Sequence, residues 1–446
     1  MIDIAGTGGP KQQLTLLDAT SMIVGIVIGV GIYETTPVIA ASVSTPFWLI
    51  GLWIVGGVLS LVGALCFAEL ASRFPEEGGD YVYLTQAWGR RTGFLFAWAV
   101  FWLVRPANIG AIAFIFAHYA QQIVPSLHGE VIYAMAAVIL LTVTNIFGVQ
   151  SGKWMQNILT AAKVLGLLLI ICVGFLMTTP EPAHPISTNT SSGSSLYLAM
   201  ILVLFTYGGW SNISYVAAEV VQPQKNILRS LVIGTLVITV IYIVINLAFV
   251  HALGLDGMRA SQAIASDLLR YALGDTGSFL ISMLICITCL NTVNGMIFTE
   301  ARIFYALGQE HRLYRVLGKW NSQLDAPLWS LVAQAIITLV LIGVIGANEN
   351  AFERLVVFSA PLHWFFFLLV GLALFRFRIK DSSNTICFRV PYYPWLPALF
   401  CISTLFMFYA SFTYAFDQKH PEAYWIIIIM VVGLIASVYD PKIPES

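Results

Sequence analysis

The stretch Gly25-Ile26-Val27-Ile28-Gly29-Val30-Gly31-Ile32-Tyr33-Glu34 lies in the middle of the first long apolar run, which extends over about residues 14–41. This run is long enough to cross a membrane, yet its centre holds three glycines followed by a carboxylate. Glycine is less favourable than alanine inside a helix by about 1 kcal/mol. In lipid, a broken helix persists only where its freed backbone groups face protein or line a cavity. The stretch therefore predicts a membrane-spanning helix that is interrupted at its centre to hold a ligand.

The composition is that of an integral membrane protein. Of the 446 residues, 58% are hydrophobic and 10% are charged, and the mean hydropathy is +0.83. Soluble domains carry roughly 25% charged residues. A net charge of −1 gives no basis for binding nucleic acid. Five of the six cysteines fall in apolar runs, where they indicate packing and not a disulfide framework.

Windows of roughly 20 apolar residues predict an all-α membrane protein with twelve transmembrane helices. The predicted spans are 14–41, 47–72, 94–124, 131–147, 154–178, 196–219, 229–253, 277–307, 328–346, 352–375, 395–416 and 423–439. Sixteen of the 22 Lys and Arg residues fall on one set of alternate connections. Cytoplasmic loops carry such an excess, so we expect both termini to be cytoplasmic. The compact termini favour a location in the plasma membrane, as the inner membrane of a bacterium.

A second interrupted span contains Phe205-Thr206-Tyr207-Gly208-Gly209-Trp210-Ser211. Because five spans separate it from the first, it crosses the membrane in the opposite direction. Two glycine-broken helices at corresponding places of two halves indicate an inverted repeat with a midplane site. We therefore predict a cytoplasmic N-terminus at 1–13, a first repeat of helices 1–5 at 14–178, and a second repeat of helices 6–10 at 196–380. Helices 11 and 12 and the cytoplasmic C-terminus occupy 381–446.

The two breaks together predict a site for the two ends of an amino acid. The N–H groups that begin the second half of helix 1, near Ile32, suit a carboxylate. The carbonyls that end the first half of helix 6, near Tyr207, suit an ammonium group. The alternative is that Gly25 and Gly29 form a G-x-x-x-G packing face; the matching break in helix 6 favours the binding site.

Ionisable residues inside the spans are candidates for coupling or gating. Lys163 lies near the midplane, where a lysine is costly and usually functional; we expect its ammonium to take the place of a coupling cation and to donate to freed carbonyls of helix 1. Arg105 precedes Pro106, which predicts a kink in helix 3, and favours a structural or gating ion pair. Glu34 faces either the outer vestibule or a partner such as Arg105. Glu219 is a candidate gate or loop anchor.

Other side chains near the breaks have two readings. Phe205 and Tyr207 either pack in the protein or cover a bound side chain, and the polar cluster at Asn291 and Thr292 either packs against helix 1 or makes ordinary interhelical hydrogen bonds. We find no metal cluster, nucleophile–base pair or cofactor motif. The sequence thus predicts neither an enzyme nor a cofactor.

Four short motifs, in the right order over about residues 14–380, resemble the amino acid–polyamine–organocation superfamily and its L-type amino acid transporter branch. Gly29-Val30-Gly31-Ile32-Tyr33 is similar to G-S-G-I-F, and Phe205-Thr206-Tyr207-Gly208-Gly209-Trp210 to F-A-Y-G-G-W. Thr160-Ala161-Ala162-Lys163 matches T-A-A-K in helix 5, and Arg105-Pro106 matches R-P in helix 3. The resemblance implies the leucine-transporter fold, alternating access and sodium-independent amino acid transport.

In such a protein, Lys163 would replace a sodium ion. The resemblance further implies that backbone at Gly29, Val30, Gly31 and Ile32 holds the substrate carboxylate, and that backbone near Val27 and Phe205 holds the amino group. Phe205 would be a gate, and Gly208 and Ser211 would border the side-chain pocket. At three positions the sequence departs from the family pattern, so the identity of the substrate is left open. Val30 occupies the position of a Ser, Ser211 that of an Asn, and the charged Glu34 that of an uncharged residue.

We therefore predict a secondary transporter of neutral L-amino acids that works by exchange or uniport. Two alternatives stay open: a proton-coupled symporter of amino acids or amines, and a nutrient sensor of the same fold. The expected partners are an amino acid substrate and membrane lipid. The loop at 124–130 lacks the cysteine by which animal relatives link to a glycoprotein, so no such disulfide-linked subunit is expected.

Overall fold

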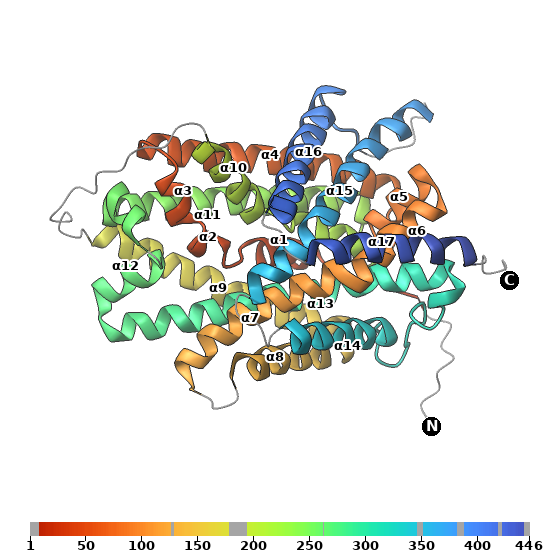
Figure 1. Ribbon diagram of the computed structural model, residues 1–446, viewed down its shortest axis with the longest axis horizontal. Coiled ribbons are helices and arrows are strands. Elements are labelled where there is room, and N and C mark those ends of the chain that lie inside the picture. The colour runs from red at the N-terminus through yellow and green to blue at the C-terminus, as the bar shows by residue number, and fades with distance from the viewer. Residues whose placement is uncertain are drawn as a thin grey trace.

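The computed structural model describes residues 9–125, 129–177, 194–261, 263–345, 351–380, 388–417 and 422–440. Within these ranges the chain is all-helical, and most of its long helices run roughly along the longest axis of the molecule, whereas α15 and α16 cross it obliquely (Figure 1). Nine helices in the described ranges are long and apolar enough to cross a membrane. The all-α membrane class is confirmed, whereas the count of twelve spans stays a prediction. Most of residues 1–13, and part of the loop at 124–130, lie outside the described residues.

The first five predicted spans correspond to eight helical segments. They are α1 (Leu16–Val27), α2 (Gly31–Glu34), α3 (Thr36–Ala41), α4 (Pro46–Arg73), α6 (Arg90–Ala99), α7 (Arg105–Ile123), α8 (Gly129–Ile146) and α9 (Val149–Leu176). The first span is thus divided into α1, α2 and α3, as the glycines predict. A short helix that the apolar runs do not reveal, α5 (Asp80–Trp88), precedes α6.

The remaining spans follow the same order. They are α10 (Ser194–Thr206) with the 3₁₀ turns η2 (Trp210–Tyr215) and η3 (Ala217–Glu219), α11 (Pro223–Ala260), α13 (Asp275–Glu310), α14 (Leu328–Ile345), α15 (Ala351–Lys380), α16 (Trp395–Asp417) and α17 (Glu422–Tyr439). Two further short segments, α12 (Ile264–Leu273) and η4 (Arg312–Tyr314), flank α13. Because the sixth span continues past its break as 3₁₀ turns, its second half is shorter and less regular than the predicted helix.

The two ends of the bundle differ in charge. We call the end where α4 stops at Arg73 and α6 starts at Arg90 the basic end; α5 and α17 also reach it, while α3 and α12 lie at the opposite end (Figure 1). At the basic end the Arg90 guanidinium donates to the Asp440 carboxylate at 2.8 Å, and Arg378 forms an ion pair with Glu69 at 2.5 Å. These contacts tie α17 to α6, and α15 to α4.

The start of the first span is fixed by a capping box. The Thr15 hydroxyl accepts a hydrogen bond from the Asp18 backbone N–H, and the Asp18 carboxylate accepts from the Thr15 N–H at 2.9 Å. This arrangement satisfies N–H groups that a helix start leaves unpaired. The spacing of Thr15 and Asp18, three residues apart, is the sequence pattern of such a cap.

The third span is irregular just before Pro106. A π-helical turn, η1 (Val100–Val104), joins α6 to α7, and Pro106 occupies the first turn of α7. A proline there needs no backbone N–H of its own, and a π turn is a common cause of a kink. The irregular turn thus lies directly before Arg105 and Pro106, in the turn that a proline disturbs, and the kink itself stays a prediction.

The N-terminal segment pairs with the end of the sixth span. Leu14 and Val220 form a parallel β-bridge. The backbone N–H groups of Gln13 and Leu14 donate to the Glu219 carbonyl at 2.8 and 2.9 Å, and the Val221 N–H donates to the Leu14 carbonyl at 2.9 Å. The chain just before α1 and the chain just after η3 are thus joined at the basic end.

Candidate functional site

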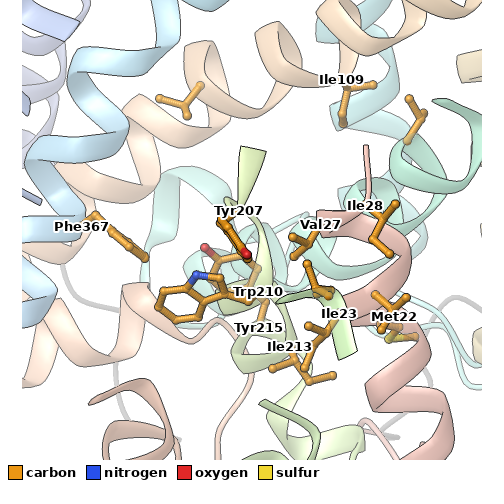
Figure 2. Close-up of a cluster of buried hydrophobic side chains, with 14 of the residues drawn as sticks. Met22, Ile23, Val27, Ile28, Ile109, Tyr207, Trp210, Ile213, Tyr215 and Phe367 are labelled. Atoms are coloured by element: carbon orange, nitrogen blue, oxygen red, sulfur yellow. The ribbon is translucent and has the colours of Figure 1, made fainter. Parts of the chain in front are cut away.

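The two helix breaks lie against each other in the middle of the bundle. The Tyr242 hydroxyl of α11 is within hydrogen-bonding distance of both the Val27 carbonyl, at 3.0 Å, and the Thr206 carbonyl, at 3.1 Å. The hydroxyls of Thr35 and Thr206 lie 3.1 Å apart. Figure 2 shows Val27 and Tyr207 at the two breaks, with Trp210 beside them. Residues about 180 positions apart in the sequence therefore form one site.

Two glycines allow this close approach. Gly209 has φ +108°, and a Cβ there would lie 2.8 Å from the Ile26 side chain. A Cβ on Gly31 would lie 3.0 Å from the Thr206 hydroxyl. Gly25 is different, since its Cβ would come within 2.3 Å of the Gln156 amide on α9. Gly25 therefore packs against a neighbouring helix, whereas a Cβ on Gly29 would meet nothing closer than 3.9 Å, so only the first glycine of the G-x-x-x-G alternative packs closely.

The first break leaves backbone donors without a backbone acceptor. Ile28 caps α1, and the Gly29 N–H donates to the Val27 carbonyl at 2.7 Å. Among the described residues, the N–H groups of Val30, Gly31 and Ile32 make no backbone hydrogen bond. These donors are the ones that the sequence assigns to a carboxylate.

Lys163 of α9 is fully buried beside the first break. Its ammonium group donates to the Gly25 carbonyl at 2.7 Å and to the Ile28 carbonyl at 2.5 Å, and lies 3.5 Å from the Thr292 hydroxyl. Donation to freed carbonyls of the first span is what the sequence predicts; the role in coupling stays a prediction. Thr292 also approaches the Gly25 carbonyl at 3.4 Å, so the polar cluster of α13 packs against the first span.

Glu34 lies on the far side of the break, toward the end opposite the basic end. It is exposed, and one carboxylate oxygen accepts a hydrogen bond from the Tyr119 hydroxyl of α7 at 3.1 Å. Arg105 is not its partner: the Arg105 guanidinium donates to Glu300 of α13 at 2.9 Å. Of the two predicted surroundings of Glu34, the pairing with Arg105 is therefore wrong.

Arg105 is the centre of a buried polar network on the basic-end side of the breaks. Besides Glu300, it donates to the Tyr215 hydroxyl at 2.7 Å, and that hydroxyl donates to Asp80 of α5 at 2.9 Å. The network joins α7, α13, η2 and α5. Asp80 and Glu300 were not predicted; the signal for Glu300 was available, since it is an acidic residue inside the predicted span 277–307.

A second ion pair holds the end of the sixth span. Glu219 of η3 accepts two hydrogen bonds from the Arg302 guanidinium of α13, at 2.6 and 3.1 Å. Both side chains are buried. Together with the Arg105 network, this pair fixes η2 and η3 against α13, so the basic-end side of the site is closed. By contrast, Phe205 at the end of α10 is 44% exposed.

A pocket lies beside the second break, between the sixth span and helices α4, α15 and α16. Gly208 and Ser211 line it together with His363 and Phe367 of α15 and Ser403 of α16. Trp210 also borders it and packs on Phe367, with ring centroids 5.7 Å apart (Figure 2).

Tyr207 points elsewhere. Its hydroxyl donates to the Trp53 carbonyl of α4 at 2.9 Å, and its ring packs on Trp53 and Tyr242. The Tyr207 side chain is thus part of the protein core, and only its backbone remains for the break.

A polytopic helical bundle with two facing helix breaks, a buried lysine at one of them and a polar network that closes one side is the architecture of a membrane transporter. The chain belongs to the amino acid permease family, whose sequence pattern matches residues 14–435. It is an integral membrane protein with several spans. The resemblance found in the four short motifs is thus confirmed at the level of the family.

Individual relatives are transporters of amino acids. The chain is 27% identical to the mouse (Mus musculus) b(0,+)-type amino acid transporter 1 over 440 residues, 95% of this chain and 87% of that protein. It is 31% identical to the human (Homo sapiens) large neutral amino acids transporter small subunit 2 over 354 residues, 76% of this chain and 66% of that protein. It is 27% identical to a cystine/glutamate transporter of Pongo abelii over 409 residues, 89% and 79% of the two chains.

Proposed function

We propose that this permease moves neutral L-amino acids across the membrane by exchange or uniport, without sodium. The observation that carries the proposal is the buried Lys163 ammonium on the carbonyls of Gly25 and Ile28. A bound sodium ion would need such carbonyl oxygens, because hard cations take oxygen ligands. The Lys163 ammonium group supplies the positive charge in place of a sodium ion.

The proposed substrate position follows from the two breaks. The carboxylate would accept from the free N–H groups of Val30, Gly31 and Ile32, and the ammonium group would lie near the carbonyls of Val27 and Phe205. Phe205 would cover the substrate. Since Val27 and Phe205 already accept hydrogen bonds from Gly29 and Gly208, the ammonium group would share these carbonyls.

The pocket at Gly208 and Ser211 would receive the substrate side chain. Aromatic rings of His363 and Phe367, stacked at 5.3 Å, form part of its wall. An apolar or aromatic side chain fits such a lining, because apolar surface is favourably removed from water there. This supports large neutral amino acids as substrates.

The proposed topology is that of the leucine-transporter fold, with twelve spans and a five-plus-five inverted repeat. The division at 14–178 and 196–380 places α1–α9 in one half and the segments from α10 to α15 in the other. The excess of Lys and Arg at the basic end supports a cytoplasmic location of this end and of both termini. We propose the plasma membrane as its location and no disulfide-linked glycoprotein subunit.

Counterflow in proteoliposomes tests this function. Purified protein in sodium-free liposomes preloaded with unlabelled leucine is expected to accumulate labelled leucine or phenylalanine, and protein-free liposomes are the control. A strict need for sodium would contradict the role of Lys163. Absence of counterflow over a panel of standard amino acids would contradict the transport proposal and favour a sensor.

A pocket variant tests the substrate class. In Ser403→Phe, the added ring occupies the pocket that Gly208 lines, so we expect counterflow of phenylalanine to fall by about tenfold more than that of alanine, a difference of about 1.4 kcal/mol. Ile402→Phe is the matched control, because Ile402 is exposed on the outside of the same helix. Equal losses for both substrates would mean that the side chain lies elsewhere.

A further inference from the structure

The segment between α4 and α5 carries a buried acid that the transport site does not use. Glu77 is only 8% exposed, although it lies outside every membrane-spanning helix. It forms an isolated antiparallel bridge with Val216, and the adjacent Gly78 N–H donates to the Tyr215 carbonyl at 3.0 Å. The segment is therefore held directly against the second half of the sixth span, at the basic end.

The charged and titratable groups that face Glu77 come from two elements. They are Glu219 of η3, and Arg302 and Tyr305 of α13. Arg302 gives two hydrogen bonds to Glu219, at 2.6 and 3.1 Å. Neither carboxylate oxygen of Glu77 has a partner in hydrogen-bonding geometry, although the backbone N–H groups of Ala218 and Glu219 approach the carboxylate. Two buried carboxylates thus face one guanidinium, and only Glu219 is paired with it.

This arrangement favours a neutral Glu77. A buried carboxylate that no side chain pairs with is unfavourable as an anion, and two neighbouring buried carboxylates do not both ionise readily. The Arg302 charge and the backbone N–H groups of Ala218 and Glu219 oppose this effect but are smaller causes than burial and the Glu219 charge. Burial, together with the nearby Glu219, raises the pKa of Glu77 well above its usual range. The bidentate contact with Arg302 identifies Glu219 as the ionised member of the pair.

We propose that Glu77 is a proton-binding site of the basic-end gate: it holds a proton while η2 and η3 are closed against it, and releases the proton when they move away. This inference rests on the proposed transport cycle, in which that gate opens. Because Glu77 is located at the basic end, the proton enters and leaves from that side. The site therefore makes gating depend on pH without carrying protons across the membrane.

The sign of the dependence follows from linkage. The closed gate binds one proton more than the open gate, in which water reaches Glu77 and its pKa returns toward about 4.3. Raising the pH therefore favours opening. For one proton, the open-to-closed ratio changes by up to about tenfold per pH unit between the two pKa values, and levels off outside them.

Counterflow measured with equal pH on both sides, from about pH 5 to about pH 8, tests the proposal. The wild-type rate is expected to rise with pH, and Glu77→Gln, which mimics the neutral acid, is expected to lose this rise. Glu76→Gln is the matched control, because Glu76 is the exposed neighbour. The proposal is overturned if Glu77→Gln keeps the wild-type profile, or if it fails to fold, since a neutral isostere should fit the closed gate.

A second readout does not depend on transport. Ser214 of η2 is fully buried in the closed gate, so a Ser214→Cys variant in a Cys172→Ser/Cys387→Ser background reports opening by its rate of thiol labelling. We expect labelling of Ser214→Cys to become faster with pH beyond the effect of thiol ionisation, and the additional Glu77→Gln change to remove that excess. The labelling rate reports gate opening directly, so it tests the role of Glu77 even if the protein transports no amino acid. A pH-sensitive dye trapped in the liposomes is expected to show no substrate-dependent proton influx; a Glu77-dependent influx would refute one-sided access.

Discussion

Removal of the Lys163 ammonium is the sharpest test of how the first break is held. In Lys163→Ala, the carbonyls of Gly25 and Ile28 lose donors at 2.7 and 2.5 Å. A hydrogen bond from a charged donor contributes about 1.5–3 kcal/mol, so the break loses on the order of 3–6 kcal/mol of support. Folding as a whole loses less, because the desolvation cost of the buried charge is removed as well.

The expected outcome is a folded protein with strongly reduced transport. If about 2.7 kcal/mol of the lost support is needed to keep the break in its binding geometry, counterflow falls by about 100-fold. Counterflow in proteoliposomes measures the rate, and size-exclusion chromatography with a thermal unfolding curve reports folding. Lys163→Met, which keeps much of the side-chain volume, separates the loss of charge from the loss of packing.

Lys153→Ala is the control on the same helix. Lys153 lies near the start of α9 and contacts Asp18 at 3.4 Å at the basic end. Asp18 keeps hydrogen bonds from the Thr15 N–H and the Asn157 amide, so the loss of Lys153 is expected to leave counterflow near wild type. Wild-type counterflow in Lys163→Ala would refute the argument. An equal loss in Lys153→Ala would show that the effect is not specific to the break.

Two further variants address packing and buried charge. In Gly25→Ala, the new methyl group lies 2.3 Å from the Gln156 amide. We expect the free energy of unfolding to fall by about 1–3 kcal/mol, which is measured as a lower melting temperature. Gly51→Ala is the control, because a methyl group there meets nothing within 4 Å, and its melting temperature should be unchanged. Arg302→Met leaves Glu219 buried without its counter-ion, which costs about 3–5 kcal/mol and should reduce the yield of monodisperse protein. Recovery in Arg302→Met/Glu219→Leu is expected, and its failure would point to another role for Arg302.

The breaks could be predicted from the sequence because their cause is local. Glycines inside long apolar runs are visible without any partner, and both interruptions lie where Gly29 and Gly208 predict them. The capping box at Thr15 follows from a local residue pattern at the start of a span. The contacts of Lys163 with the first span could be predicted because a charged residue near the midplane needs polar partners.

The remaining features depend on contacts between distant segments. The short helix α5 is not part of an apolar run, and the burial of Glu77 becomes visible only when the sixth span is packed over it. Arg105 could be recognised as needing a partner, but its choice of Glu300 over Glu34 is decided by how α7 and α13 pack. Pro106 indicates an irregular turn in the third span, but that this is a π turn at Val100–Val104 could not be predicted from the sequence.

The pairing of Leu14 with Val220 has a mechanical consequence. It joins the start of the first broken span to the end of the second. We therefore expect α1 and the turns η2 and η3 to move together in any rearrangement of the basic end. Truncation of the chain through Leu14 would therefore remove the link between the two spans, while every residue of the proposed binding site stays present. We therefore expect the described chain just before α1 to affect transport, although it forms no part of the proposed binding site.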